Sequence, residues 1–366
     1  MTHRFIIAGG GTGGHIFPAL AIADALRSLK PDSAFQFIGA KGKMEMEKIP
    51  QAGYAIVGLD IVGLDRKNWI KNLSLPIKLI RSFWQVRSIF HAFRPTAVIG
   101  VGGYSSYPVL RYAQSQGIPT FLHESNSYAG KSNQWLGKRA TRIFTGMSGM
   151  EKFFPADRMI HTGNPVRPSI ASTHTNRADA LRSFGLDPAK RTLLVIGGSL
   201  GARSINQALN NGWQRLTEAG LQIIWQTGKS DTSLSVIPSD KSQCVIRLPF
   251  IQDMPMAYAV ADIVVARAGA MSIAELQVVG KPAILVPFPL AAEDHQAVNA
   301  QQLVNAGAAI LVRDAEAGST LINRVLELNA DASRCEKMSH QISGMAIRNA
   351  DQRVASSILE CLNKSN

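Results

Sequence analysis

The chain has 366 residues, of which 46% are hydrophobic and 18% are charged, and its formal net charge is +13. This length and composition are typical of a globular protein with two domains and exclude a disordered chain. We expect neither a signal peptide nor a membrane span, since no apolar run approaches the ~20 residues that a span requires.

Strand and helix patterns alternate along the first half of the chain. The expected strands lie at residues 4–8, 35–38, 54–59, 97–101, 119–123, 142–145 and near 159–162. The first strand runs into five glycines, and a helix is expected to begin at Pro18, because proline suits the first turn of a helix.

The same pattern restarts in the second half, where residues 192–203 predict a strand, a glycine turn and a helix. The expected strands lie near residues 192–197, 221–226, 244–248, 262–266, 283–287 and 308–312, and the expected helices lie near 203–219, 254–260, 272–279, 295–306 and 319–329. Such alternation predicts parallel sheets with helices on both faces. The fold class is therefore α/β, with two doubly wound domains.

The domain boundary is expected within residues 161–170, HTGNPVRPSI, which contain two prolines and a glycine. We assign residues 1–163 to the N-terminal domain and residues 164–344 to the C-terminal domain. Residues 353–364 predict one amphipathic helix at the end of the chain.

The first glycine turn suits an anion. Glycine lets a ligand approach the backbone closely, and the helix N-terminus beyond it offers unpaired N–H groups. Gly9, Gly11 and Gly14 match the dinucleotide pattern G-x-G-x-x-G, but no acidic residue ends the second strand to bind a ribose, and Asp32 precedes that strand. The pattern thus disfavours NAD and leaves open a purely structural turn or another role beside a phosphate.

Seven motifs, in register along the chain, carry the functional signal. They are GGTGGH (10–15), VGGYSSYP (101–108), HESN (123–126), GNPVR (163–167), GGSLGAR (197–203), ARAGAMSIAELQ (266–277) and AAEDHQAVNA (291–300). Together they resemble the MurG family, the UDP-N-acetylglucosamine:lipid I transferases of bacterial peptidoglycan synthesis, over essentially the whole chain.

The resemblance implies the GT-B fold, in which two Rossmann-like domains face a central cleft. It puts the acceptor lipid on the N-terminal domain and the donor nucleotide on the C-terminal domain, with residues 345–366 packing back on the first. The implied reaction is an inverting transfer of GlcNAc from UDP-GlcNAc to the MurNAc 4-hydroxyl of lipid I (undecaprenyl-pyrophosphoryl-MurNAc-pentapeptide), which forms lipid II.

The resemblance also implies the donor contacts. Glu275 would accept hydrogen bonds from both ribose hydroxyls, although Ser272 and Glu275 also fit an S-x-x-E capping box. Ser199 would contact the diphosphate or only cap a helix, and the backbone of Ile251 would contact uracil unless that residue is merely core. The full expected set for UDP-GlcNAc is Thr12, Gly13, Gly14, Asn126, Arg167, Ser199, Ile251, Ala270, Met271, Ser272, Ile273, Ala274, Glu275 and Gln296.

Three of these residues have equally plain structural alternatives. Gln296 and Asn126 resemble polar contacts to the sugar, but either side chain could serve only loop hydrogen bonding. Arg167 resembles the phosphate-side arginine of the family, and its alternative is a surface arginine.

Two residues are candidates for the catalytic base. An inverting transfer needs a base on the attacking hydroxyl and charge stabilisation on the leaving diphosphate. His15 would lie where the acceptor hydroxyl arrives, and histidine titrates near neutral pH. Glu124, in HESN, ends a strand in the same cleft. The sequence leaves both open, together with a purely structural role for His15.

No metal ion or cofactor is expected. Cys244, Cys335 and Cys361 are scattered and form neither a disulfide nor a metal framework. The chain contains no D-x-D, so helix dipoles and arginine would stabilise the leaving diphosphate. We therefore expect full activity in EDTA.

The positive charge is concentrated in the first half of the chain. Residues 1–163 carry 20 Lys/Arg and 9 Asp/Glu, a net of +11, whereas residues 164–366 carry 19 and 17, a net of +2. Residues 68–94 interleave aromatic and aliphatic residues with lysine and arginine. Such a surface is attracted to an anionic membrane, although Leu79, Phe83, Val86 and Phe90 also fit the core stripe of a helix.

The resemblance implies a peripheral protein on the cytoplasmic face of the bacterial plasma membrane, with other cell-wall enzymes as further partners. One alternative keeps the fold and transfers the sugar to diacylglycerol. A second is a UDP-GlcNAc 2-epimerase, against which residues 68–94 argue. A nucleic-acid-binding module is disfavoured, because the chain lacks a reading motif and a stacking platform.

Overall fold

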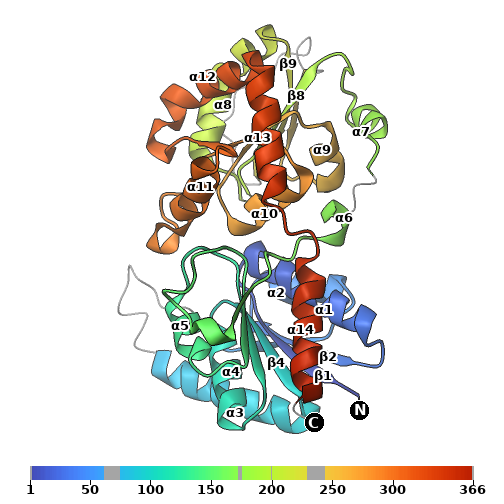
Figure 1. Ribbon diagram of the computed structural model, residues 1–366, viewed down its shortest axis with the longest axis vertical. Helices are drawn as coiled ribbons and strands as arrows, with labels where there is room; N and C mark the ends of the chain where they lie inside the picture. The colour runs from blue at the N-terminus through green and yellow to red at the C-terminus, as the bar shows by residue number, and fades with distance from the viewer. Residues whose placement is uncertain (1, 62–74, 172–174, 199, 229–243, 365–366) are drawn as a thin grey trace. The chain divides into compact units, whose positions relative to one another are not determined.

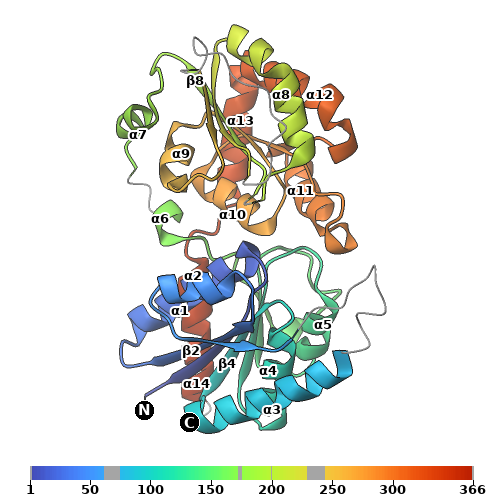
Figure 2. The same ribbon diagram turned by 180° about the vertical axis from the view of Figure 1, so that it is seen from behind.

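A computed structural model describes residues 2–61, 75–171, 175–198, 200–228 and 244–364. The chain divides into two compact units (Figures 1 and 2). The first unit comprises Met1–Arg167 and Arg348–Asn366, and the second comprises Pro168–Ile347. Each unit is a parallel sheet with helices on both faces, so the expected pair of Rossmann-like domains is confirmed.

The first sheet has seven parallel strands, which lie side by side in the order β3-β2-β1-β4-β5-β6-β7. Their bounds are β1 (Arg4–Gly9), β2 (Ala34–Ala40), β3 (Ile56–Leu59), β4 (Ala97–Gly102), β5 (Thr120–Glu124), β6 (Arg142–Thr145) and β7 (Met159–His161). The helices of this unit are α1 (Gly13–Leu29), α2 (Glu45–Gln51), α3 (Leu75–Phe93), α4 (Ser106–Ser115), α5 (Lys131–Gly137), the 3-10 turn η2 (Ala156–Arg158) and α14 (Ala350–Lys364).

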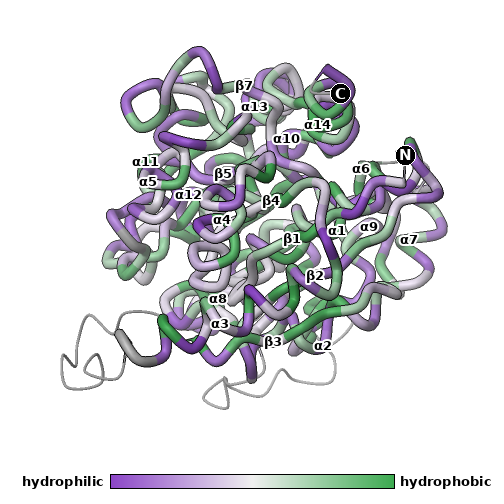
Figure 3. Tube along the Cα trace, turned by 90° about the horizontal axis from the view of Figure 1, so that it is seen from below, coloured by the Kyte–Doolittle hydropathy of each residue, from purple (hydrophilic) through white to green (hydrophobic). Residues whose placement is uncertain are grey.

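Both faces of the first sheet are buried, which explains why its strands are continuously hydrophobic. Alternate residues of β1 serve opposite faces: Phe5 and Ile7 pack in the cluster that contains α1 and α14, whereas Ile6 and Ala8 pack in the cluster that contains α3, α4 and α5. Figure 3 shows the central strands β1 and β4 as mainly hydrophobic and α3 as alternating in character.

The final helix α14 belongs to the first unit and lies along α1 (Figure 1). Val354, Ile358 and Leu362 recur every four residues and are buried with α1 in one cluster. This spacing places one stripe of the helix on the core, as its amphipathic sequence requires.

The second sheet has six parallel strands in the order β10-β9-β8-β11-β12-β13. Their bounds are β8 (Arg191–Ile196), β9 (Leu221–Gln226), β10 (Val245–Leu248), β11 (Ile263–Ala266), β12 (Ala283–Leu285) and β13 (Ala309–Leu311). The helices are α6 (Pro168–Ala171), α7 (Arg177–Phe184), α8 (Arg203–Glu218), α9 (Met254–Val260), α10 (Ala270–Val279), α11 (His295–Asn305), α12 (Ala317–Ala330) and α13 (Ala332–Gly344), with 3-10 turns η3 (Ala292–Asp294) and η4 (Asp314–Glu316).

The sequence located the strands within two residues but misplaced the start of the first helix. Helix α1 begins at Gly13, five residues before Pro18, because the carbonyl of Thr12 accepts the N–H groups of His15 and Ile16. Pro18 then lies inside the helix, where it removes the single bond that would reach Gly14.

Strand order identifies one topological switch point in each unit. The chain reverses its direction of winding between β1 and β4 in the first sheet and between β8 and β11 in the second. Ligands of doubly wound folds bind at the carboxyl ends of the strands, at such switch points. The loops after β1, β4, β8 and β11 therefore lie where ligands bind in folds of this type.

Candidate active site

His15 lies in the first turn of α1, directly after the glycine loop. Its Nδ1 is 3.0 Å from the carbonyl oxygen of Gly10. Because a carbonyl can only accept, Nδ1 carries the hydrogen, and the neutral ring has its lone pair on Nε2. The fold thus presents His15 in the form that can accept a proton at Nε2.

The loop after β4 packs directly on the first glycine loop. The N–H of Gly10 donates to the carbonyl of Gly102 at 3.2 Å. Gly102 and Gly103 both have φ in the left-handed range, and a Cβ on Gly102 would lie 2.7 Å from Nε2 of His15. Glycine at 102 therefore lets the His15 ring lie close against the backbone of this loop.

The residues between this loop and His15 form the open N-terminus of α1. Thr12 is the N-cap of α1, but its side chain makes no capping hydrogen bond. Within the described part of the chain, the N–H groups of Gly13 and Gly14 have no hydrogen-bond partner. A helix N-terminus with open N–H groups stabilises a negative charge, so Thr12, Gly13 and Gly14 lie where a diphosphate or sugar could bind.

Glu124, the rival base, is occupied by hydrogen bonds. Its Oε1 accepts from the N–H of Asn126 at 3.1 Å and from the amide of that side chain at 3.4 Å. Its Oε2 accepts from the Asn133 side chain at 2.8 Å and from the N–H of Gly130 at 3.4 Å. The carboxylate is buried and orders the loop from β5 to α5. Asn126 is likewise engaged in this loop.

A second histidine, His123, is fully buried one residue before Glu124. Burial, with a smaller contribution from the nearby His15, lowers the pKa of His123 to about 4. At neutral pH this ring is therefore uncharged. The sequence analysis did not select it, because a histidine inside a strand carries no local signal of its burial.

Arg167 is the last residue of the first unit, four residues beyond the expected boundary. Its guanidinium lies over the ring of Phe17, 4.9 Å from the centroid. Since Phe17 is on α1 two residues after His15, this cation–π contact brings the positive charge of Arg167 to the first turn of α1.

In the second unit, helix α10 begins after β11, at the switch point, and its N-terminus has no side-chain cap. Its N-cap is Gly269, and the helix begins at Ala270. The capping-box alternative for Ser272 is therefore wrong, because Ser272 lies inside the first turn and not at the cap. The backbone of Ala270 and Met271 forms that turn, and these two residues are buried, as are Ile273 and Ala274.

Glu275 is also free of a capping role. It is 8% exposed, and its Oε2 accepts the hydroxyl of Tyr258 on α9 at 3.0 Å. A buried carboxylate that receives a tyrosine hydroxyl is restrained in orientation, while its other oxygen can accept further donors. The sequence did not reveal Tyr258, because it lies on a different helix.

Some of the groups expected to contact uracil and the sugar form hydrogen bonds within the protein. Ile251 is buried, and its N–H donates to Oε1 of Gln226 at 2.9 Å, so that N–H is occupied. Gln226 also donates to the carbonyl of Gly198 at 2.9 Å and so joins the two loops. Gln296 accepts the N–H of Phe288 at 2.9 Å. Ser199 lies outside the described residues.

Arg267 was also missed by the sequence analysis. It follows β11 and contacts the neighbouring loops: it pairs with Asp314, donates to the carbonyls of Val286 and Pro287, and reaches the hydroxyl of Ser204 at 3.2 Å. One side chain thereby ties together the loops at the carboxyl edge of the second sheet. Its only sequence signal is its position at a strand end.

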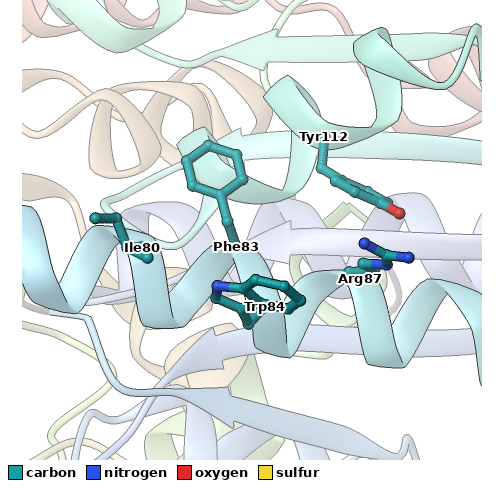
Figure 4. Close-up of a pocket in the computed structure, with 5 residues that line it drawn as sticks. All are labelled: Ile80, Phe83, Trp84, Arg87 and Tyr112. Atoms are coloured by element: carbon teal, nitrogen blue, oxygen red, sulfur yellow. The ribbon is translucent and has the colours of Figure 1, made fainter.

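Helix α3 presents an apolar groove at the surface of the first unit. Ile80, Phe83, Trp84 and Arg87 line it together with Tyr112 of α4 (Figure 4). Ile80 is 59% and Trp84 65% exposed, whereas Val86 and Phe90 of the same helix are buried in the core. Of the expected core stripe, Leu79, Val86 and Phe90 pack in the core, whereas Phe83 lines the groove beside Ile80 and Trp84. Residues 68–74, including Trp69 and Lys71, lie outside the described residues.

Among the described residues, the structure shows neither a membrane-spanning helix nor a metal-binding cluster. No helix there is both long enough and apolar enough to cross a bilayer. No group of three or more His, Cys, Asp and Glu side chains is arranged there to hold a metal ion.

The family of the chain follows from comparison with known proteins. Residues 5–145 match the glycosyltransferase family 28 N-terminal domain, and residues 192–354 match the corresponding C-terminal domain. A protein of Bacteroides fragilis is 47% identical over 99% of this chain and 96% of its own length, and one of Cytophaga hutchinsonii is 45% identical over 99% and 97%. Both are named UDP-N-acetylglucosamine–N-acetylmuramyl-(pentapeptide) pyrophosphoryl-undecaprenol N-acetylglucosamine transferase. The chain belongs to the MurG family.

Solved structures agree with this MurG assignment. The crystal structure of Acinetobacter baumannii MurG matches with a TM-score of 0.77 and 26% identity, covering 98% of this chain and all of that one. A UDP-N-acetylglucosamine 2-epimerase matches with a TM-score of 0.68 but only 13% identity, which shows a shared fold alone. The protein is thus a UDP-sugar glycosyltransferase with the GT-B fold, as its motifs predicted.

Proposed function

We propose that this protein transfers GlcNAc from UDP-GlcNAc to the MurNAc 4-hydroxyl of lipid I and so forms lipid II. The observation that carries the proposal is the 43–47% identity, over nearly the full chain, to relatives named as that transferase. The geometry of the two switch points supports the assignment of individual residues.

The donor is assigned to the second unit. The open N-terminus of α10, at Ala270 and Met271, stabilises the diphosphate. Glu275, restrained by Tyr258, accepts the ribose hydroxyls. For the uracil edge we assign the carbonyl of Ile251, since its N–H is used by Gln226. The side-chain oxygen of Gln296 accepts the N–H of Phe288, so its amide N–H groups are assigned to the sugar hydroxyls.

The acceptor and the base are assigned to the first unit. Nε2 of His15 takes the proton from the MurNAc 4-hydroxyl as that oxygen forms its bond to C1 of GlcNAc. The bond from C1 to the diphosphate oxygen breaks at the same time, and UDP leaves with the electron pair. Attack from the face opposite to the leaving group inverts the anomeric centre. Arg167 adds positive charge beside this turn.

Between the two candidate bases, the geometry favours His15. His15 is half-buried, and the bond from Nδ1 to the carbonyl of Gly10 leaves the lone pair of its neutral ring on Nε2. Both oxygens of Glu124 accept donors of their own loop. We therefore assign Glu124 to ordering residues 124–133.

We further propose that the α3 groove contacts an anionic membrane. Its exposed Ile80 and Trp84 lie next to Arg87, whose guanidinium is 5.8 Å from the Trp84 ring centroid. Apolar and basic groups on one helix face suit the boundary between headgroups and acyl chains. The protein would then work peripherally on the cytoplasmic face of the plasma membrane.

The deciding experiment measures UDP release from UDP-GlcNAc with and without a short-chain lipid I analogue. We expect release to depend on the analogue and to persist in EDTA. Release that depends instead on diacylglycerol, or interconversion of the sugar without any acceptor, would replace the proposal with the glycolipid or the epimerase alternative. Loss of activity in EDTA that magnesium restores would contradict the metal-free step.

A further inference from the structure

A buried carboxylate, Glu45, lies directly beneath the first glycine loop. It begins α2 and is 1% exposed. Its Oε2 accepts the N–H of Gly11 at 2.8 Å, and its Oε1 accepts the N–H of Ala40 at 3.0 Å. Both oxygens therefore act as acceptors, and the start of a helix favours the negative charge.

The protein makes room for this side chain at two glycines. A Cβ on Gly10 would collide with the carboxyl group of Glu45, and a Cβ on Gly39 would lie 2.5 Å from its Cγ. The carboxylate thus fills the space that the missing side chains leave. Glu45 thus joins the glycine loop to the end of β2, where it bonds to Ala40.

Glu45 and His15 bond to the same peptide group. The carboxylate accepts the N–H of Gly11, and His15 donates its Nδ1 hydrogen to the carbonyl of Gly10. That carbonyl and that N–H belong to the single peptide unit joining Gly10 to Gly11. The order of contacts is therefore carboxylate, peptide group, imidazole.

We propose that Glu45 is a positioning residue that acts on His15 through the Gly10–Gly11 peptide group. A carboxylate at the N–H end polarises the peptide and strengthens its carbonyl as an acceptor. The stronger acceptor holds the hydrogen on Nδ1 and the lone pair on Nε2. In a Ser-His-Asp triad the carboxylate does this by direct contact with the ring, whereas here one peptide group intervenes. The functional part of this inference rests on His15 being the base of the proposed reaction.

The first test is a double-mutant cycle in the full-length protein. Glu45→Gln preserves the size of the side chain but removes its charge and turns an N–H donor toward Gly11 or Ala40. We expect kcat to fall on the order of 10-fold in the wild-type background and by no more than about twofold in His15→Ala, because the two residues act as a unit. The matched control is Glu47→Gln, which removes an exposed carboxylate from the same helix. It should leave kcat unchanged.

The second test needs no substrate. Nitrogen-15 NMR of labelled histidine reports the tautomer of His15, assigned with the His15→Ala variant. We expect the Nδ1–H form to dominate in the wild type and the Nε2–H form to gain population in Glu45→Gln. A wild-type ring in the Nε2–H form would overturn the proposal even if Glu45→Gln did not fold.

Equal losses of kcat in both backgrounds would also overturn it, because Glu45 would then only support the fold. The proposed transferase activity and the proposed role of Glu45 can be disproved independently of each other. A wild-type protein with no acceptor-dependent UDP release disproves the transferase, whereas the tautomer measurement still tests the link between Glu45 and His15.

Discussion

Each unit has a turn at its switch point that leads from a strand into a helix without a side-chain cap, but the side chains around the two turns differ. In the first unit a buried carboxylate, Glu45, occupies the N–H of Gly11, and a histidine follows in the helix. In the second unit α10 starts behind Gly269 with no side-chain cap, and its carboxylate, Glu275, lies a turn further along. The roles that we propose differ accordingly: the base His15 belongs to the first turn, and the donor diphosphate and ribose belong to the second. Neighbouring helices complete both arrangements: α2 supplies Glu45 in the first unit, and α9 supplies Tyr258 in the second.

The largest expected effect is the loss of kcat when His15, in the first unit, is replaced. His15→Ala should lower kcat by about 10²- to 10⁴-fold, the range typical of a lost general base, while the dissociation constant for UDP stays the same. Glu124→Gln should lower kcat by less than about 10-fold, because its carboxylate orders a loop. Steady-state kinetics and calorimetric UDP titration measure both. The reverse ranking of the two variants would make Glu124 the base.

The histidine next to Glu124 should make the first unit sensitive to acid. The pKa of His123 is lowered to about 4, so between about pH 6.5 and pH 4 the unfolded chain binds a proton that the folded chain does not. The stabilisation that neutral His123 contributes to the folded state is therefore fully present above about pH 6.5 and is lost as the pH falls. We expect the free energy of unfolding to decrease by about 2 kcal/mol between pH 7 and pH 5.

Urea unfolding at these two pH values measures the loss. In His123→Gln the unfolding free energy should be lower at pH 7 but should fall less on acidification than in the wild type. An equally steep fall in the variant would show that other groups cause the acid sensitivity.

In the second unit, the proposed contact between Glu275 and the ribose predicts a loss of UDP binding. Glu275→Gln should weaken UDP binding by about 10- to 100-fold, because it replaces charge-assisted hydrogen bonds with neutral ones. Tyr258→Phe removes the hydroxyl that restrains the carboxylate and should weaken binding by about threefold. Calorimetry with UDP separates the two variants. Unchanged binding in Glu275→Gln would move the ribose site elsewhere.

The smallest effect concerns the surface of the first unit. Replacing Ile80 and Trp84 together with serine removes exposed apolar area without disturbing the core. Binding to vesicles with anionic lipid should fall about 10-fold, and salt should weaken binding of the wild type. Leu29→Ser, at another exposed apolar position of the unit, is the control and should bind like the wild type. Equal binding by both variants would exclude α3 as the membrane contact.

The sequence alone determined the parallel sheets, the restart of the pattern and the family. These rest on local signals: buried parallel strands are continuous apolar runs, and the glycine turns stand at strand ends. The start of α1 was misjudged for the same reason, since the Pro18 signal is local, whereas the bonds from Thr12 that begin the helix depend on the path of the loop.

Only the tertiary structure decided what the site residues can do. It put Ser272 inside α10, occupied both oxygens of Glu124, and joined Glu275 to Tyr258. It also brought Glu45 to the peptide group that orients His15. A sequence lists the side chains in chain order, but the form in which a histidine or a carboxylate reacts depends on the donors and acceptors around it. Those partners come from strands and helices that are adjacent only in the folded protein.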